Sequence, residues 1–336
     1  MSKNLGKKKV FLILIYIIYL LFLVEIFLRI AGICYSTIVA PRADEGSLKD
    51  ENAFRILCIG DSCTYGVGAP SGKSYPSQLY KLLNEKAGTE QFCVINRGVP
   101  GLNSSQALRL VKHFVPLYKP DVLLFLCGHN DFWNLEDIKL TENERINPLE
   151  YSAILANIYL SNLRIYKLYQ SFFLTKFYVK NFINIDAQSN NVKAYAEWED
   201  EENYKISKHI NDLYVCTPES FSFFAENKRI LDIIRTKNIE EVCKVSRRNN
   251  AKLFFLSYPD KEINKRAYFK EELLKKYNVC YINNIDLFNR VQNKGFRLFR
   301  SDGFHPNELG YYYIAVNIYN AFIDNGIIDA EKIKLI

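Results

Sequence analysis

The chain has 336 residues, 49% of them hydrophobic and 24% charged, which suits an ordered protein with one large domain or two small ones. Its net charge is +7 and its pI is near 8.8. Part of that excess is a group of lysines before residue 10. The rest is scattered without a basic stripe or a nucleic-acid-binding motif, so we expect no nucleic acid partner.

An apolar run follows the basic tail of residues 1–9. Residues 10–33 are long enough to cross a bilayer as a helix, which needs roughly 20 apolar residues, although Glu25 and Arg29 interrupt them. These two lie four residues apart and can face each other on one side of the helix near the membrane interface. By the positive-inside rule, the preceding lysines predict a cytoplasmic tail, with everything after residue 35 outside.

We predict that this run is an uncleaved signal anchor and that the chain is a single-pass membrane protein. A cleaved signal peptide is the alternative, but the residues before Pro41 and before Tyr35 make poor cleavage and lipoprotein sites. A buried helix of a soluble protein fits less well, because the segment is so apolar and directly follows three lysines. Residues 34–53 then form a linker.

The eight cysteines show no spacing typical of a zinc site, so no metal is expected. Cys58, Cys93 and Cys127 fall in or at the end of apolar runs, where a buried thiol acts as a small apolar residue. We therefore expect mostly free, buried thiols, although cysteines outside the cytoplasm can also pair.

Five short apolar runs are typical of strands buried on both faces of a sheet. They are residues 54–60, 92–96, 121–128, 251–259 and 279–283. Helical patterns separate them, and a last helix runs from Pro306 to Gly326. This alternation predicts a parallel, doubly wound α/β sheet, and ligands of such sheets bind outside the carboxyl ends of the strands.

A long insertion, at about 132–220, separates the third strand from the next helix. Its first part is rich in Tyr, Phe and Leu with interleaved Arg and Lys, and its second part is polar and acidic. We expect one or two helices that pack against the core. The alternatives are a cap over the functional site and an amphipathic surface that lies on the membrane.

The stretch from Arg55 to Ser74, RILCIGDSCTYGVGAPSGKS, raises the question of a phosphate-binding loop. The P-loop pattern G-x-x-x-x-G-K-[ST] requires glycine at position 67, which is valine, and the dinucleotide pattern G-x-G-x-x-G requires it at position 71, which is serine. Such loops depend on particular backbone N–H groups that converge on an anion, so a shift of one residue matters. We therefore do not predict phosphate binding.

Ser62 is a better candidate, because it comes two residues after the first strand, at the end where sites form. A nucleophilic serine needs a base, a group that orients the base, and oxyanion donors. His305 follows the last predicted strand, and Asp302 precedes it by three residues. A tight turn through Gly303 can fold the carboxylate back onto the imidazole and leave the other ring nitrogen for Ser62. Each feature alone is equally typical of a helix cap, a turn or a surface histidine.

Two further loops contain candidate donors for an oxyanion. N-R-G-V-P-G follows the second strand, and its glycines let the backbone approach a ligand closely. G-H-N-D follows the third strand, and its Asn130 offers a side-chain amide. A glycine N–H, this amide and the N–H of Ser62 can together stabilise a tetrahedral oxyanion. Four loops at one edge of the predicted sheet thus each carry one part of an acyl-transfer site.

In this order the blocks GDS, NRGVPG, GHND and DGFH resemble the four blocks of the SGNH (GDSL-type) hydrolase family, and the pattern spans residues 54 to about 325. The resemblance implies a flavodoxin-like three-layer α/β/α fold with a parallel five-stranded sheet, and Ser-His-Asp ester hydrolysis without a cofactor. By position it implies Ser62 as the nucleophile, His305 as the base and Asp302 as the group that orients the base.

The same resemblance implies an oxyanion hole made of the Ser62 N–H, the Gly101 N–H and the Asn130 amide, with Gly98 the less favoured glycine. His129 stands where many relatives have glycine, and the insertion is longer than in compact members. Both departures bear on substrate specificity rather than on the chemistry.

We therefore predict that residues 54–330 form an SGNH hydrolase domain outside the cytoplasm, attached to a membrane anchor. The predicted activity is hydrolysis of carboxylic esters, with removal of acyl groups, acetyl among them, from cell-envelope carbohydrate or lipid. The alternatives are O-acyl transfer onto a secreted polysaccharide and a non-catalytic, membrane-tethered binding module.

Overall fold

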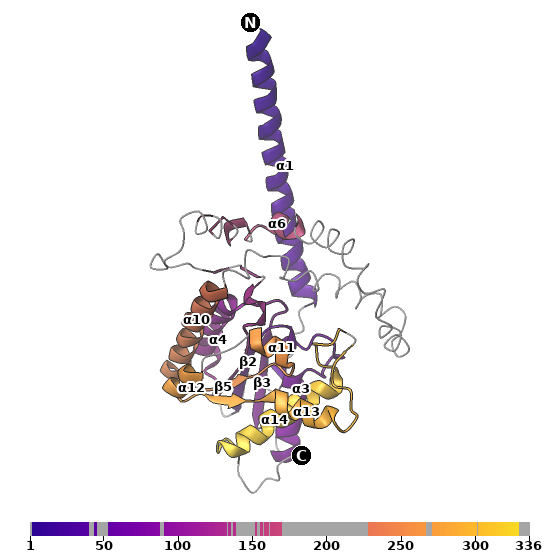
Figure 1. Cartoon of the computed structure of the whole chain (residues 1–336), viewed down its shortest axis with the longest axis vertical. Coiled ribbons are helices and arrows are strands. Elements are labelled where there is room, and N and C mark those ends of the chain that lie inside the picture. The colour runs from indigo at the N-terminus through magenta and orange to yellow at the C-terminus, as the bar shows by residue number, and fades with distance from the viewer. Residues whose placement is uncertain are drawn as a thin grey trace. The chain divides into compact units, whose positions relative to one another are not determined.

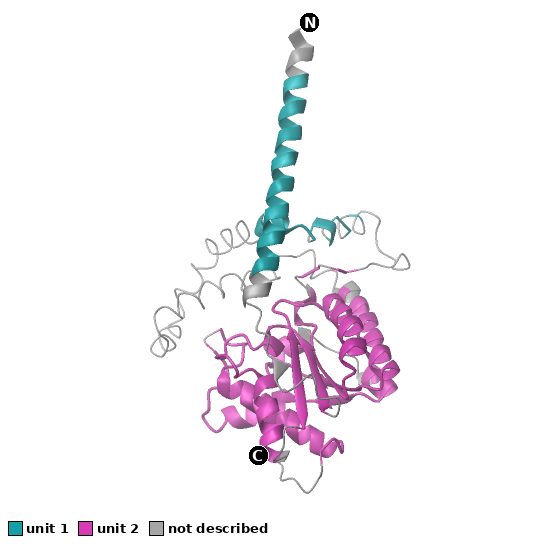
Figure 2. Cartoon of the chain, turned by 180° about the vertical axis from the view of Figure 1, so that it is seen from behind, with its two compact units in different colours: residues 1–41, 146–193, 212–216 teal, residues 42–145, 194–211, 217–336 magenta. Residues whose placement is uncertain are grey.

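The computed structural model covers the apolar N-terminal helix and the predicted sheet domain. The described residues are 2–39, 44–45, 53–87, 91–132, 134–135, 137–138, 152, 155–156, 158–160, 162–169, 228–266, 271–300 and 302–328. They separate into two compact units, one drawn from residues 1–41, 146–193 and 212–216 and the other from 42–145, 194–211 and 217–336 (Figure 2). Most of the insertion predicted at 132–220 and of the linker predicted at 34–53 lies outside the described residues.

The first unit is built on one long helix, α1 (Ser2–Val39) (Figure 1). From Lys8 to Cys34 this helix is long and apolar enough to cross a membrane, and a signal sequence near an N-terminus has the same length and composition. From Val10 to Ile33 its large apolar side chains are exposed, apart from the partly buried Leu28. The short helix α6 (Arg164–Tyr169) belongs to the same unit.

The second unit is organised around a six-stranded sheet (Figure 1). Its five parallel strands are β2 (Phe54–Gly60), β3 (Phe92–Gly98), β4 (Val122–Leu126), β5 (Lys252–Leu256) and β6 (Cys280–Ile282). They lie in the order β3-β2-β4-β5-β6, which is the flavodoxin order 2-1-3-4-5 when the parallel strands are counted along the chain. The predicted parallel five-stranded sheet and flavodoxin-like fold are therefore confirmed. A two-residue strand, β1 (Asp44–Glu45), pairs antiparallel with β3 and is an addition that the sequence did not predict.

Helices cover both faces of this sheet, and strand side chains alternate between the faces. One face packs against α3 (Tyr75–Ala87), α13 (Asn284–Gln292) and α14 (Glu308–Asp324), and the other against α4 (Ser104–Tyr118), α10 (Lys228–Arg248) and α12 (Glu271–Tyr277). Along β2, Ile56 and Cys58 join the first core, and Leu57 and Ile59 join the second. Two cores therefore enclose the sheet, which accounts for its continuously apolar strands.

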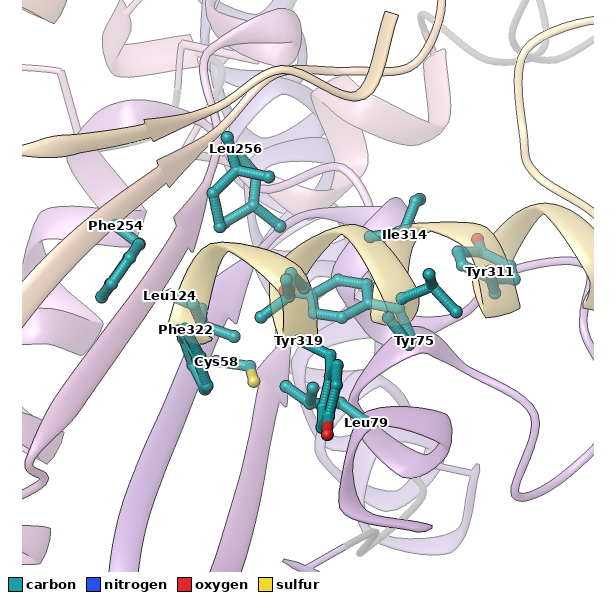
Figure 3. Packing of buried hydrophobic residues seen from close by; sticks show 14 of the residues in the cluster. Cys58, Tyr75, Leu79, Leu124, Phe254, Leu256, Tyr311, Ile314, Tyr319 and Phe322 are labelled. Carbon is teal, nitrogen blue, oxygen red and sulfur yellow. The ribbon is translucent and has the colours of Figure 1, made fainter. Parts of the chain in front are cut away.

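The core beneath α14 contains aromatic side chains that also hold the turn after β2 (Figure 3). Tyr75 and Tyr311 are fully buried. The Tyr311 hydroxyl donates to the Val67 carbonyl oxygen at 2.8 Å, and the Tyr75 hydroxyl shares a 3.2 Å hydrogen bond with the Thr64 hydroxyl. Core packing thereby fixes α2 (Ser62–Tyr65), the short helix that follows β2.

The seven cysteines among the described residues form no disulfide, and five of them are buried. Burial raises the pKa of the Cys63 and Cys127 thiols well above the ordinary value, so both stay protonated at neutral pH. The expectation of mostly free, buried thiols is confirmed for this part of the chain. The five buried cysteines act as small apolar core residues rather than as nucleophiles.

The close approach of β3 to α2 gives a test of this packing. A Cβ atom on Gly98 would lie 2.2 Å from the backbone nitrogen of Tyr65 and 2.6 Å from the carbonyl carbon of Thr64. Because backbone atoms yield less readily than the end of a flexible side chain, we expect Gly98→Ala to lower the free energy of unfolding by about 3 kcal/mol. Urea denaturation of the full-length protein in detergent, followed by circular dichroism, measures the loss.

Gly295→Ala is the matched control. No atom lies within 4 Å of the Cβ that it adds, and only its φ of +90° introduces strain, for which we expect about 1 kcal/mol. Equal losses in the two variants would contradict the tight contact between β3 and α2.

Candidate active site

Ser62 lies in the turn that directly follows the central strand β2. The end of this strand is held from both sides: Asp61 N–H donates to the Leu126 carbonyl oxygen at 3.3 Å, and Val99 N–H donates to the Gly60 carbonyl oxygen at 2.9 Å. Asp61 caps α2, because its Oδ1 accepts the N–H of Cys63 at 3.0 Å. Ser62 is therefore fixed in the first turn of α2 and is only 9% exposed.

Asp302 and His305 are held together by the turn that the sequence predicts. Asp302 Oδ1 accepts the N–H groups of Phe304 at 3.1 Å and His305 at 2.9 Å. Gly303 has a φ of +78° and donates its N–H to the Arg300 carbonyl oxygen at 3.0 Å, a conformation that glycine adopts without strain. The other carboxylate oxygen of Asp302, Oδ2, lies 2.9 Å from His305 Nδ1.

The structure brings Ser62, Asp302 and His305 into one chain of hydrogen bonds. His305 is 1% exposed, and its Nε2 lies 2.9 Å from Ser62 Oγ. Because an ionised carboxylate only accepts hydrogen bonds, Nδ1 carries the proton and donates to Asp302. The Nε2 atom of a neutral ring is then the acceptor for the Ser62 hydroxyl, which is the arrangement that an acyl-transfer base requires.

The charge on Asp302 is stabilised by its partners. Burial raises the pKa of this carboxyl, but the side-chain hydrogen bond and charge of His305 and the two backbone N–H donors outweigh burial and hold the pKa below its ordinary value of 3.8. Asp302 is therefore a carboxylate at neutral pH, and it can stabilise an imidazolium on His305.

The two glycines considered for the oxyanion hole differ in their hydrogen bonds and backbone. Gly98 N–H donates to Asn96 Oδ1 at 2.9 Å, so it serves to hold its own loop. Gly101 adopts a φ of +75°, and its carbonyl oxygen accepts from Asn134 Nδ2 at 2.7 Å. Because the Gly98 N–H is already bonded to Asn96, Gly101 is the better candidate for the backbone donor of the oxyanion hole.

Asn130 is buried in the 3-10 helix η1 (His129–Phe132), which follows β4. Its Nδ2 donates to the Leu102 carbonyl oxygen at 3.1 Å and lies 3.3 Å from Asp61 Oδ2. The amide therefore connects the loops that follow β2 and β3, beside the turn that holds Ser62.

Asp61 and Tyr258 form a buried pair that sequence reasoning missed. The Tyr258 hydroxyl, at the end of β5, donates to Asp61 Oδ2. Burial raises the pKa of Asp61 from 3.8 to about 6, and the hydrogen bonds from Tyr258 and from Cys63 N–H offset only part of this effect. The one signal for Tyr258 in the sequence is its place at the carboxyl end of a predicted strand.

A second buried pair fixes η1. Arg235 Nε, on α10, donates to Asp131 Oδ2 at 2.8 Å, and both side chains are almost completely buried. Asp131 Oδ1 accepts the Ser104 N–H, at the start of α4, at 2.6 Å. Because Asp131 follows Asn130 directly, this pair limits the movement of the Asn130 backbone. No pattern in the sequence singles out Arg235.

The sequence of this site matches a known family. The model of the GDSL-like Lipase/Acylhydrolase family matches residues 58–206, a span that contains Ser62, Gly101 and Asn130. Over this span, which is less than half of the chain, the sequence is similar to that family. The resemblance seen in its sequence blocks is thereby confirmed, and the ester hydrolase chemistry that the family name describes is the chemistry that the site geometry permits.

The chain is also similar to other proteins, at lower coverage or lower identity. An uncharacterized protein of Mycoplasma pneumoniae is 31% identical over 124 residues, which cover 34% of this chain and 14% of the length of that relative. A solved α/β hydrolase enzyme from the metagenome of Lake Arreo, Spain, is 13% identical, with a TM-score of 0.44 and coverage of 80% of this chain and 94% of the other. A Clostridium thermocellum family 3 carbohydrate esterase is 18% identical, with a TM-score of 0.41 and coverage of 83% and 99%.

The raised pKa of Asp61 predicts a pH-dependent cost of removing the Tyr258 hydroxyl. In the folded protein the pKa of Asp61 is raised to about 6, against 3.8 for an ordinary carboxyl. The stability that this group contributes is therefore present below pH 3.8 and is lost as the pH rises through 6. Tyr258→Phe removes a donor that favours the carboxylate, so we expect its cost in unfolding free energy to be larger at pH 7.5 than at pH 5, by about 1 kcal/mol.

Urea denaturation at the two pH values measures this difference, and Tyr311→Phe is the matched control. The Tyr311 hydroxyl is also buried, but it donates to a neutral carbonyl oxygen, so its cost should not change with pH. The same pH dependence in both variants would contradict the role of Tyr258 as a partner of the Asp61 carboxylate.

Proposed function

We propose that this protein is a serine-dependent carboxylic ester hydrolase in which Ser62 is the nucleophile, His305 the base and Asp302 its orienting group. The observation that carries the proposal is the buried chain of two 2.9 Å hydrogen bonds that joins these three side chains. It lies at the carboxyl edge of a parallel sheet, where ligands of this fold class bind.

The proposed reaction follows from this geometry. Ser62 Oγ attacks the ester carbonyl carbon as His305 Nε2 takes the hydroxyl proton, and the Asp302 carboxylate stabilises the resulting imidazolium. The alcohol leaves with that proton, and an acyl group remains on Ser62. Water, activated by the same imidazole, then attacks the acyl-enzyme and releases the acid.

The oxyanion of the tetrahedral intermediate is assigned to the Ser62 N–H, the Gly101 N–H and the Asn130 amide. The Asn130 contact with Asp61, at 3.3 Å, is longer than its contact with Leu102, at 3.1 Å. We infer that the bound oxyanion replaces the longer contact, while Leu102 keeps the amide in place.

The proposed substrate is an acyl ester, acetyl esters among them, on cell-envelope carbohydrate or lipid. The support for this class is the apolar helix α1 with its preceding lysines, which favours a single-pass anchor with the hydrolase unit outside the cytoplasm. A retained anchor is favoured over a cleaved signal because Glu25 accepts the backbone N–H groups of Arg164 and Ile165, and cleavage would remove that acceptor.

Transfer of an acyl group to a polysaccharide hydroxyl uses the same Ser62, His305 and Asp302, and it differs only in the acceptor that replaces water. A non-catalytic binding module is less well supported, because no member of the hydrogen-bonded chain is missing.

Release of nitrophenol from acetyl and longer acyl esters by the full-length protein tests the proposal. We expect hydrolysis that Ser62→Ala abolishes without loss of the folded state, because the substitution removes the hydroxyl that accepts the acyl group. The preferred chain length then separates a deacetylase from an enzyme of lipid esters. No hydrolysis by folded protein at any chain length would contradict the hydrolase and favour a transferase or a binding module.

Asn130→Ala tests the oxyanion assignment separately. One oxyanion donor typically increases the rate by a factor of about 10²–10³. We therefore expect kcat of Asn130→Ala to fall by that factor while the variant remains folded. Asn317→Ala is the matched control, since Asn317 also donates two hydrogen bonds, to Asn283 and Asn284, away from the site. Full activity of Asn130→Ala would show that its assignment is wrong.

A further inference from the structure

Two opposite charges stand in the otherwise apolar part of α1. Glu25 and Arg29 lie one turn apart, and Arg29 Nε donates to Glu25 Oε1 at 2.8 Å. Such a pair contributes only about 0.3–0.5 kcal/mol on an exposed helix, which does not offset the cost of placing charges near hydrocarbon. Their other contacts account for their presence.

Glu25 holds the start of α6. Its Oε1 accepts the backbone N–H of Arg164 at 3.0 Å, and its Oε2 accepts that of Ile165 at 2.9 Å. The first N–H groups of any helix have no partner within the helix. Glu25 thus satisfies two of these donors of α6, and its side chain is 12% exposed.

Arg29 holds the turn before α6. Its Nη2 donates to the Asn162 carbonyl oxygen at 2.9 Å. Asn162 Nδ2 in turn donates to the Ile158 carbonyl oxygen at 2.8 Å. The two charges of α1 therefore bind opposite backbone groups of one chain reversal, and the backbone groups named here are paired within the protein.

The position of this reversal along α1 corresponds to a membrane surface. At 1.5 Å per residue, Arg29 lies roughly 30 Å along the helix axis from Lys9, and the hydrocarbon core of a bilayer is about 30 Å thick. If Lys9 marks one edge of the core, Glu25 and Arg29 lie at the other edge. Irregular backbone is tolerated at that depth only when its polar groups are paired within the protein.

The exposed side chains around this reversal suit the same location. They are large and apolar or aromatic: Tyr159, Leu160, Leu163, Leu168 and Tyr169. Arg164 and Lys167 lie among them. Tyrosines at the level of the lipid head groups, together with cations that reach phosphate, are typical of membrane-interface segments.

We propose that the described residues between 158 and 169 (158–160 and 162–169) form an interfacial membrane element that α1 holds against the outer leaflet of a phospholipid bilayer. The Glu25 and Arg29 contacts fix the element at the membrane surface, and its tyrosine and leucine side chains contact lipid. This inference rests on the proposed membrane anchor, and it adds a second, non-spanning contact with the bilayer.

Photo-crosslinking tests the contact directly. The full-length protein is reconstituted into phosphatidylcholine vesicles that contain a phosphatidylcholine with a diazirine near the glycerol end of its acyl chain, and labelled peptides are mapped by mass spectrometry. We expect label in α1 and in residues 158–169. We expect none at Tyr281 and Phe296 of the second unit, which are 44% and 49% exposed and serve as matched apolar controls.

The labelling pattern separates the two proposals. Label in α1 without label in 158–169 overturns the interfacial element and leaves the anchor intact, whereas absence of label from α1 overturns the anchor and this inference with it. Equal labelling of Tyr281 and Phe296 overturns the inference as well, because exposure alone would then explain the result.

Glu25→Leu tests the role of the α1 contacts. The variant removes the acceptor of two backbone N–H groups but keeps α1 apolar, so we expect label in 158–169 to fall at least fivefold while label in α1 is unchanged. Val24→Leu, an apolar exchange at the neighbouring position, should leave both unchanged. Unchanged label in 158–169 of Glu25→Leu would show that α1 does not hold the element.

Discussion

The candidate site depends on how closely three strand ends approach one another. A Cβ on Gly60 would lie 2.3 Å from the Leu126 carbonyl oxygen, and one on Gly98 would lie 2.2 Å from the backbone nitrogen of Tyr65. Glycine at position 60 lets the ends of β2 and β4 meet, and glycine at position 98 lets the end of β3 approach α2, with no side chain between them. Ser62, Gly101 and Asn130 come from the three loops that leave these ends, so their spacing is set by backbone contacts.

The pKa values of two buried carboxyl groups near His305 are shifted in opposite directions. Asp302 receives hydrogen bonds from His305 and two backbone N–H groups, which hold its pKa below the ordinary value despite burial. Asp61 also receives three hydrogen bonds, but all three come from neutral groups and offset only part of the effect of burial, so its pKa rises to about 6. Opposed environments of this kind assign distinct roles to like groups. Asp302 is suited to stabilise charge on the imidazole, and Asp61 to accept hydrogen bonds from the Tyr258 hydroxyl and the Asn130 amide.

The sequence predicted the sheet because its strands are apolar on both faces. It predicted the three hydrogen-bonded residues because Ser62 follows the first strand and because the GDS and DGFH blocks resemble blocks of the SGNH family. Those signals are local. The Arg235–Asp131 pair joins residues 104 positions apart, and the Tyr258–Asp61 pair joins residues 197 apart, so both depend on which helix or strand packs beside which. Hydrophobic periodicity reports that a face is buried, but it does not report the polar partner that the face receives. The strand β1 was missed because two residues are too short to show a period.

The same limit applies to α1, where the sequence indicated a pair between Glu25 and Arg29 but not what the pair binds. Within a spanning helix each charge costs about 2.5–3.5 kcal/mol at the bilayer centre, and less at the edge, where the charge reaches water. The contacts with Arg164, Ile165 and Asn162 offset the cost of these charges. Without them, the backbone groups would be unpaired, and each unpaired group at the same depth costs several kcal/mol. The cost of the Glu25 charge is thus smaller than the cost of leaving the two backbone N–H groups that it accepts unpaired. These contacts exist only while α1 stays joined to the rest of its unit, so they support the proposed retained helix.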